Sequence, residues 1–259
     1  MTKGETYEDF ISKFNTKKHK PNTDDCYTPP EIYEAVRQWV GDKVMPLEGV
    51  HIVRPFYPGG DYEHYDYPEG CLVLDNPPFS ISRQIIRFYD ERGINYFLFA
   101  NGLTIFNSLS DKNTCITCYP SLEYANGAKV NTGFVTNIFP GNPAFVVAGD
   151  LYLTLQEIQD RGKSKRNYKR KPVLKRFDPH VLTAASIQHL CTAGKFFVAP
   201  RKECHLNKVK LDCQVKPYGN FLYVSDRIAD FFQRHTEITN IELSEREWNI
   251  ISELNRNQP

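Results

Sequence analysis

Apolar positions along the first 150 residues alternate between short continuous runs and helical spacing. Runs at 71–75 and 96–100 predict buried strands, because runs of four to eight apolar residues bounded by turn residues are typical of a sheet core, and a short strand is expected at 50–54. Helical spacing between them predicts helices over 29–40 and 81–92. The pattern also predicts a short helix at 103–109 and strands at 114–119, 128–139 and 145–148. Asn126-Gly127 is a turn sequence that predicts a hairpin between the first two of these strands. This alternation indicates an α/β fold with a partly parallel sheet and an antiparallel end.

The pattern of apolar and polar positions changes in the second half of the chain. Its pattern predicts helices over 179–191 and 227–234, strands at 196–199 and 218–224, and a last helix from Ser244 to about Asn255. Ser244 and Glu247 fit a capping box at the start of that helix. The expected organisation is a polar basic arm (1–23), a core (24–150), a target-recognition region or structural lid (151–225), and C-terminal helices that pack on the core (226–259).

Composition indicates where the protein is located, and the cysteine spacing argues against a metal centre. Apolar residues make up 41% of the chain, and no run approaches the roughly 20 residues that span a membrane. The N-terminus has no apolar segment of the kind found in signal peptides, so we expect a cytoplasmic protein. The seven cysteines include one isolated pair, Cys115 and Cys118, at CxxC spacing. Zinc needs a second pair, so these two are expected to be ordinary strand residues.

The charge distribution indicates a nucleic-acid partner more clearly than the net charge of +1 does. The segment 161–176 holds nine basic residues and no acidic one. Such a block neutralises several phosphates when it binds DNA, although a solvated surface is the alternative. A weaker basic set lies in the arm at 13–20. The candidate DNA contacts are Lys163, Lys165, Arg166, Tyr168, Lys169, Arg170 and Lys171.

The segment that indicates a chemistry is Asn76-Pro77-Pro78-Phe79, directly after the apolar run that ends at Asp75. An amine conjugated with a heteroaromatic ring is a poor nucleophile. The Asn76 side-chain oxygen and the Pro77 carbonyl can each accept one of its hydrogens, which directs the lone pair away from the ring. The two prolines fix the backbone at this point, and Phe79 can stack on the base. An ordinary turn at a strand end is the alternative.

This tetrad resembles motif IV of S-adenosylmethionine (SAM)-dependent amino-methyltransferases. Tyr27-Thr28-Pro29-Pro30 is similar to the Tyr-Thr-Pro segment that precedes the SAM domain of many adenine methyltransferases, although it also fits a plain helix start with Thr28 as N-cap. Together with the blocks at 54–61, 75–80 and 131–137, these segments resemble the EcoRI-type DNA adenine methyltransferases, including compact bacteriophage forms. The resemblance covers about residues 20–140.

The resemblance implies an abbreviated Rossmann-like SAM-methyltransferase sheet, and a SAM-dependent enzyme that methylates adenine N6 in double-stranded DNA. In a phage setting the modification protects sites from restriction, and the location is the host cytoplasm. The catalytic residues are then Asn76, Pro77, Pro78 and Phe79, with the target base flipped out of the duplex. The implied SAM contacts are Tyr27, Thr28, Pro29, Arg54, Pro55, Phe56, Gly59, Gly60, Asp61 and Asp75.

The approach to the tetrad departs from the usual SAM site, which has a strand with an acidic end and a Gly-x-Gly loop. Only about 20 residues separate Arg54 from Asn76, and a βαβ unit needs roughly 30. Either the SAM pocket is abbreviated, with Asp61 or Asp75 in place of the usual acid, or SAM binding has been lost. The chain would then be a catalytically silent nucleic-acid- or protein-binding relative. The same tetrad also occurs in enzymes that methylate RNA or protein glutamine.

Overall fold

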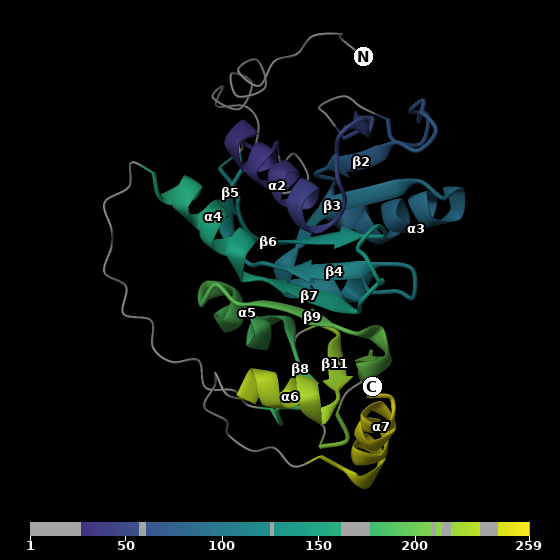
Figure 1. The fold of residues 1–259 in the computed structure, drawn as a ribbon, viewed down its shortest axis with the longest axis vertical. Helices are drawn as coiled ribbons and strands as arrows, with labels where there is room; N and C mark the ends of the chain where they lie inside the picture. The colour runs from purple at the N-terminus through teal and green to yellow at the C-terminus, as the bar shows by residue number, and fades with distance from the viewer. Residues whose placement is uncertain are drawn as a thin grey trace.

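The computed structural model describes residues 27–56, 61–124, 127–161, 177–208, 211–213, 219–233 and 243–258. Its centre is a mixed, mostly parallel sheet with the strand order β1-β2-β3-β6-β4-β7-β9, and β5 pairs with β6 (Figure 1). The strands are β1 (Ile52–Val53), β2 (Leu72–Asp75), β3 (Asn95–Asn101), β4 (Thr114–Thr117), β5 (Ser121–Glu123), β6 (Lys129–Thr136), β7 (Phe145–Ala148) and β9 (Phe196–Ala199). This is an α/β architecture compatible with a Rossmann-like fold, as the alternation of elements predicts.

Strand direction follows the predicted pattern in part, because the sheet is mixed but the antiparallel strand β6 lies in its middle as well as β9 at its end. The pairs β1–β2, β2–β3 and β4–β7 are parallel, whereas β6 is antiparallel to both β3 and β4. The carboxyl ends of β1, β2, β3, β4 and β7 therefore meet at one edge of the sheet. In open α/β sheets this edge is where ligands bind.

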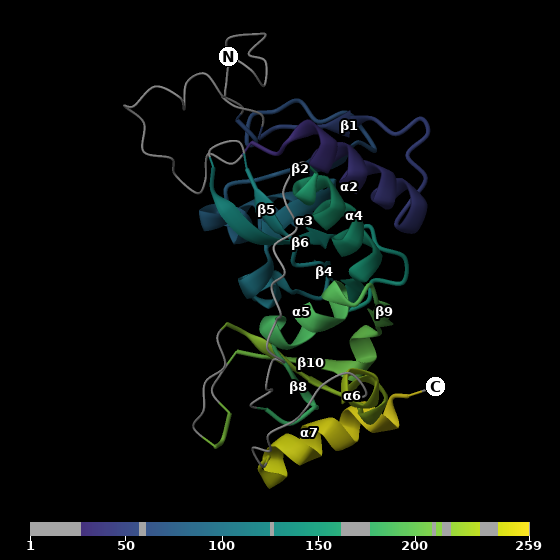
Figure 2. The ribbon, with the colours of Figure 1, turned by 90° about the vertical axis from the view of Figure 1, so that its left-hand side faces the viewer.

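Helices cover both faces of the central sheet. The first helix, α2 (Pro30–Lys43), brings Trp39 to within 6.2 Å of Phe97, while Tyr89 of α3 (Ser82–Arg92) lies 5.9 Å from Tyr96, measured between ring centroids. Consecutive strand residues point to opposite faces, so α2 and α3 pack on opposite sides of β3. Two further helices, α4 (Gly149–Asp160) and α5 (Ala184–Thr192), continue the layer that α2 begins (Figure 2).

The helix that follows the tetrad starts one residue after the predicted position and ends at the predicted residue, Arg92. Ile85, Ile86 and Tyr89 form its buried stripe. Gly93 then adopts φ 64°, a left-handed conformation that glycine adopts without strain, and the Ile94 amide donates to the Tyr89 carbonyl. This sharp end returns the chain directly into β3.

The hairpin predicted at Asn126-Gly127 joins different strands from those expected. The predicted strand 114–119 ends at Thr117, because Tyr119 adopts φ 66° and interrupts the pairing. The chain resumes as β5, which pairs with β6 through a turn in which Gly127 has φ 78°. β4 and β5 thus form one broken strand along β6, with Tyr119 at a bulge-like break.

A three-stranded sheet, ordered β10-β11-β8, lies beyond β9 (Figure 1). It contains β8 (Val181–Leu182), β10 (Cys204–Asn207) and β11 (Phe221–Val224), with the short helix η3 (Arg201–Glu203) before β10. Two helices complete this part, α6 (Asp226–Gln233) and α7 (Glu245–Arg256). The capping box predicted for the last helix is present: Ser244 accepts from the Glu247 amide, and the Glu247 side chain accepts from the Ser244 amide.

The helix predicted over 179–191 begins later than expected. Val181 and Leu182 pair with β11 instead, and α5 starts at Ala184 behind a capping box between Thr183 and Ser186. The residues assigned to the target-recognition region divide between the two sheets, since β9 pairs with β7 whereas β8, β10 and β11 form the small sheet. In the part of the chain that the structure describes, no helix is long and apolar enough to cross a membrane.

His180 links the small sheet to the C-terminal helices. Its Nδ1 lies 2.7 Å from Asp178 Oδ1 and its Nε2 lies 2.9 Å from Asp226 Oδ1. The ring meets Trp248 of α7 edge-on, with centroids 5.1 Å apart. Burial lowers the pKa of His180, but the hydrogen bonds and charges of Asp178 and Asp226 outweigh burial and raise this pKa above 6.5.

This geometry predicts a pH-dependent contribution to stability. Because the folded-state pKa of His180 is raised, its protonated form stabilises the fold fully below about pH 6.5, and the contribution is lost as the pH rises through the folded-state pKa. We expect His180→Gln to lower the melting temperature more at about pH 5.5 than at about pH 9. Thermal unfolding of both proteins at both pH values tests this, and an equal difference at the two values would contradict it.

Candidate active site

The tetrad lies at the carboxyl end of a central parallel strand. All four residues of β2 are buried, Asn76 is 8% exposed, and Pro77 is buried. Pro78 and Phe79 are half-buried, and Phe79 begins the short helix η1 (Phe79–Ile81) that leads into α3. The tetrad thus sits where β1, β2 and β3 end side by side, as the sequence predicts.

Asp75 fastens the tetrad to the segment that follows β1. Its Oδ2 accepts from the Phe56 amide at 2.7 Å, and its Oδ1 accepts from the Asn76 amide at 2.9 Å and from Arg54 Nε at 3.4 Å. Burial raises the pKa of Asp75, and the Arg54 charge and the two amides oppose that rise. The carboxylate therefore holds Arg54, Phe56 and Asn76 at fixed positions around the strand end. Pro55, between Arg54 and Phe56, is buried.

Arg54 joins this segment to the start of α2. Its guanidinium lies 4.0 Å from the ring centre of Tyr33 and 5.8 Å from that of Tyr27. The Tyr33 hydroxyl donates to the Leu74 carbonyl at 3.0 Å. Burial raises the pKa of Tyr33 to about 12, so the hydroxyl stays protonated as a donor. Three of the four segments that carry the resemblance thus have residues that meet at the end of β2, whereas the fourth, 131–137, lies mostly on β6. Tyr33 is a contact that the sequence does not single out.

Thr28 lies buried beside this junction without the capping role expected of it. The N-cap of α2 is Pro29, and the helix has no side-chain capping bond. Pro29 and Pro30 carry no N–H, and the helix starts one residue later than a Thr28 cap requires. Thr28 is 1% exposed, and its Oγ1 has no hydrogen-bond partner among the described residues. A buried hydroxyl in this state has unused capacity to bind a polar ligand group.

Phe79 meets a second aromatic residue across the site. Its ring lies edge-on to Tyr124, with centroids 6.5 Å apart. Tyr124 is buried, and its hydroxyl shares a hydrogen bond of 2.9 Å with Thr132 Oγ1 on β6. The β5–β6 hairpin therefore sets the angle of the Phe79 ring. No local pattern singles out Tyr124, because it reaches the site only through the pairing of β5 with β6.

Asp61 makes its contacts away from this junction. Its carboxylate accepts from the Glu63 amide at 3.0 Å and lies 2.8 Å from His64 Nδ1 on an exposed surface. The side-chain hydrogen bond to His64 lowers the pKa of Asp61. Other predicted site residues lie outside the described ranges: Gly59, Gly60, Lys163, Lys165, Arg166, Tyr168, Lys169, Arg170 and Lys171.

The described residues contain no group of three or more His, Cys, Asp and Glu side chains that could hold a metal ion. Cys115 lies on β4 and Cys118 directly after it, and both are fully buried. Burial raises the pKa of each thiol, which disfavours the thiolate that metals bind.

Comparison of the chain with protein-family models, curated proteins and solved structures gives no match. The geometry of the site alone therefore defines the chemistry that it can perform. That geometry is a rigid Asn-Pro-Pro-Phe end of a parallel strand, braced by a buried carboxylate, beside a buried hydroxyl.

Proposed function

We propose that the protein is a SAM-dependent methyltransferase that acts on the N6 amine of adenine in DNA. The observation that carries this proposal is the convergence of Tyr27-Thr28, Arg54–Phe56 and Asn76–Phe79 at the carboxyl end of β2. These segments are far apart in sequence, and Asp75 and Arg54 connect them directly. Their convergence supports the resemblance beyond what motif order alone offers.

The acceptor side is the better supported half of the proposal. The main-chain amide of Asn76 donates a hydrogen bond to Asp75, and Pro77 has a fixed φ, so the backbone that carries the Asn76 side chain and the Pro77 carbonyl is held in place. The side-chain oxygen and the carbonyl would accept the two hydrogens of a flipped adenine amine, and Phe79 would stack on the ring. The amine loses its proton after methylation, so the site needs no strong base.

On the donor side, SAM would supply an electrophilic methyl group. Thr28 and Tyr27 fit the polar methionine end of this cofactor, because the buried Thr28 hydroxyl has no partner among the described residues. Arg54 holds the Tyr27 ring in place. These residues would bind and orient the cofactor beside Asn76.

A second candidate function is favoured by the same part of the structure. Two acids, Asp75 and Asp61, could replace the acidic residue that usually binds the ribose of SAM, but both have other partners. Asp75 bonds to Phe56, Asn76 and Arg54. Asp61 bonds to Glu63 and His64. Among the described strands, β1 is the outermost on its side of the sheet. A nucleic-acid-binding relative that no longer binds SAM would have this arrangement.

The two candidates are separated by incubating the protein with labelled SAM and with DNA, RNA and protein acceptors, followed by nucleoside and amino-acid analysis. We expect label in N6-methyladenine from DNA. Label in RNA or in protein glutamine would replace the proposed acceptor with another. Calorimetry that detects no binding at about 1 mM SAM, with and without DNA, would leave only the binding function.

A further inference from the structure

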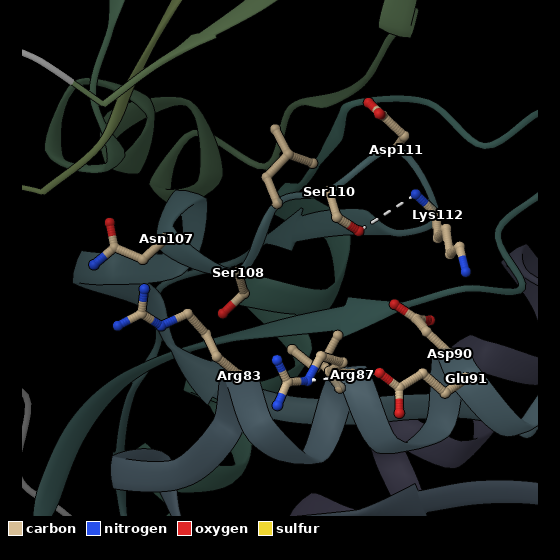
Figure 3. Close-up of a pocket in the computed structure, with 11 residues that line it drawn as sticks. Arg83, Arg87, Asp90, Glu91, Asn107, Ser108, Ser110, Asp111 and Lys112 are labelled. Atoms are coloured by element: carbon tan, nitrogen blue, oxygen red, sulfur yellow. Dashed lines mark hydrogen bonds and ion pairs between the residues drawn. The ribbon is translucent and has the colours of Figure 1, made fainter.

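A cleft of about 470 Å³ opens between α3 and the segment 107–112 (Figure 3). One wall is the exposed side of α3, which begins three residues after Phe79. The opposite wall continues from η2 (Gly102–Ser108), the short helix that follows the carboxyl end of β3. The cleft therefore starts close to the strand ends that carry the tetrad. Its volume is in the range of sites that hold a small ligand group.

The charges in the cleft are balanced at the end far from the tetrad. Arg87 Nε lies 3.7 Å from Glu91 Oε1. Asp90 accepts a hydrogen bond of 3.0 Å from the Tyr96 hydroxyl, and it faces the charge of Lys112. Asp111 also lies at this end (Figure 3). Anions are not favoured here, because each cation has an acid beside it.

The end near the tetrad carries a cation without such a partner. Arg83 lies in the first turn of α3, at the same end of the cleft as Asn107 and Ser108 of the opposite wall (Figure 3). In the described part of the chain, its guanidinium makes no hydrogen bond or ion pair. A single exposed arginine is ordinary on a surface. Arg83 differs because it lines a cleft opposite an amide and a hydroxyl.

Asn107 is already oriented by the rest of the fold. Its Oδ1 accepts from the Asn220 amide at 3.1 Å, next to β11. Because the oxygen is engaged there, the Nδ2 group remains as a donor. This contact also joins η2 to the segment predicted to recognise the target. The cationic end of the cleft thus lies between the tetrad and that segment.

We propose that Arg83, Asn107 and Ser108 bind a backbone phosphate of the DNA strand next to the flipped base. The planar guanidinium suits two phosphate oxygens, and amide and hydroxyl donors complete many phosphate contacts. The positive end of the α3 dipole favours an anion at the same place. This inference rests on the proposed function and adds a contact that fixes the position of the strand relative to Asn76.

The test compares binding of a duplex oligonucleotide by the full chain, by Arg83→Ala and Arg83→Gln, and by the control Arg92→Ala. Arg92 lies in the last turn of α3 and packs over the Phe88 ring, outside the cleft. Loss of one phosphate contact should weaken DNA binding about tenfold and reduce the slope of log K against log salt by about 0.9. The control should keep the slope of the unmodified protein. Melting temperatures confirm that each variant is folded.

The outcomes distinguish a failure of the phosphate contact from a failure of the proposed function on which it rests. Failure of the unmodified protein to bind duplex DNA would contradict the proposed function. If the unmodified protein binds DNA and both Arg83 variants keep its salt slope, only the phosphate contact is contradicted. An equal loss of DNA affinity in Arg92→Ala would contradict that contact as well. Stabilisation of the unmodified protein by inorganic phosphate, lost in Arg83→Ala without any change in the DNA salt slope, would assign the site to a free anion instead.

Discussion

Asn76→Ala is expected to reduce methyl transfer to DNA by at least about 10²-fold, the loss typical of removing one polar group that stabilises developing charge. The substitution removes the oxygen proposed to accept one hydrogen of the adenine amine. The fold should persist, because Asp75 is held by Phe56 and Arg54 and its bond from residue 76 comes from the main-chain amide. Transfer of labelled methyl groups and thermal unfolding measure the two effects separately.

Two matched variants sharpen this result. Asn76→Asp keeps an acceptor oxygen of the same size and should retain more activity than the alanine variant. Asn95→Ala removes an asparagine from the opposite end of the neighbouring strand β3 and should leave activity unchanged. Full activity in Asn76→Ala would refute the role of Asn76, and an equal loss in Asn95→Ala would indicate a general effect on the sheet.

Arg227→Ala is expected to lower the free energy of unfolding by about 3 kcal/mol, because it leaves a buried carboxylate without its charged partner. Glu203 is 1% exposed, and its two oxygens accept from Arg227 Nη2 at 2.8 Å and Nε at 2.9 Å. Ser225 Oγ donates a further bond of 2.7 Å. Urea unfolding at neutral pH measures the loss.

The pH dependence of this loss identifies its cause. In the native protein burial raises the pKa of Glu203, but the Arg227 and Ser225 hydrogen bonds outweigh burial and hold this pKa below 4.5. Without Arg227 the burial effect dominates, the carboxyl protonates more readily, and the difference in stability should shrink as the pH falls towards 4.5. Arg246→Ala is the control, since it removes a similar two-bond contact to the exposed Asp212. A loss that is the same at every pH, or as large in the control, would contradict the role of Glu203 burial.

The predicted elements that match the structure are those whose signals are local. The apolar run of β2, the helical stripe of α3 and the capping box of α7 are each decided by neighbouring residues. The predicted start of α5, at residue 179, was wrong. Val181 and Leu182 form a strand there instead, because they pair with β11, about 40 residues away. β10 and α4 were not predicted at all. β10 depends on the same distant strand, β11, for its pairing.

In the candidate site, too, local signals can be read from the sequence, whereas contacts that depend on strand pairing cannot. The position of Asn76 at a strand end follows from the run before it and the prolines after it. The bond from Phe56 to Asp75 and the contact of Tyr124 with Phe79 do not, because they depend on β1 pairing with β2 and on β5 pairing with β6. The candidate catalytic residues can be found from the sequence, whereas the residues that hold them in place are determined by the pairing of distant strands.

The antiparallel strand β6 has a consequence for how the molecule unfolds. It bonds to β3 along 132–136 and to β4 along 134–136. Among the strand pairs that the structure describes, it alone connects the β1–β3 half of the sheet to the half that contains β4, β7 and β9. Opening either half exposes one edge of β6, so partial unfolding is costly and both halves are expected to melt as a single cooperative unit. A destabilising change in the half that contains β4, β7 and β9 would then affect the tetrad by lowering the population of the folded state, and not by a local distortion.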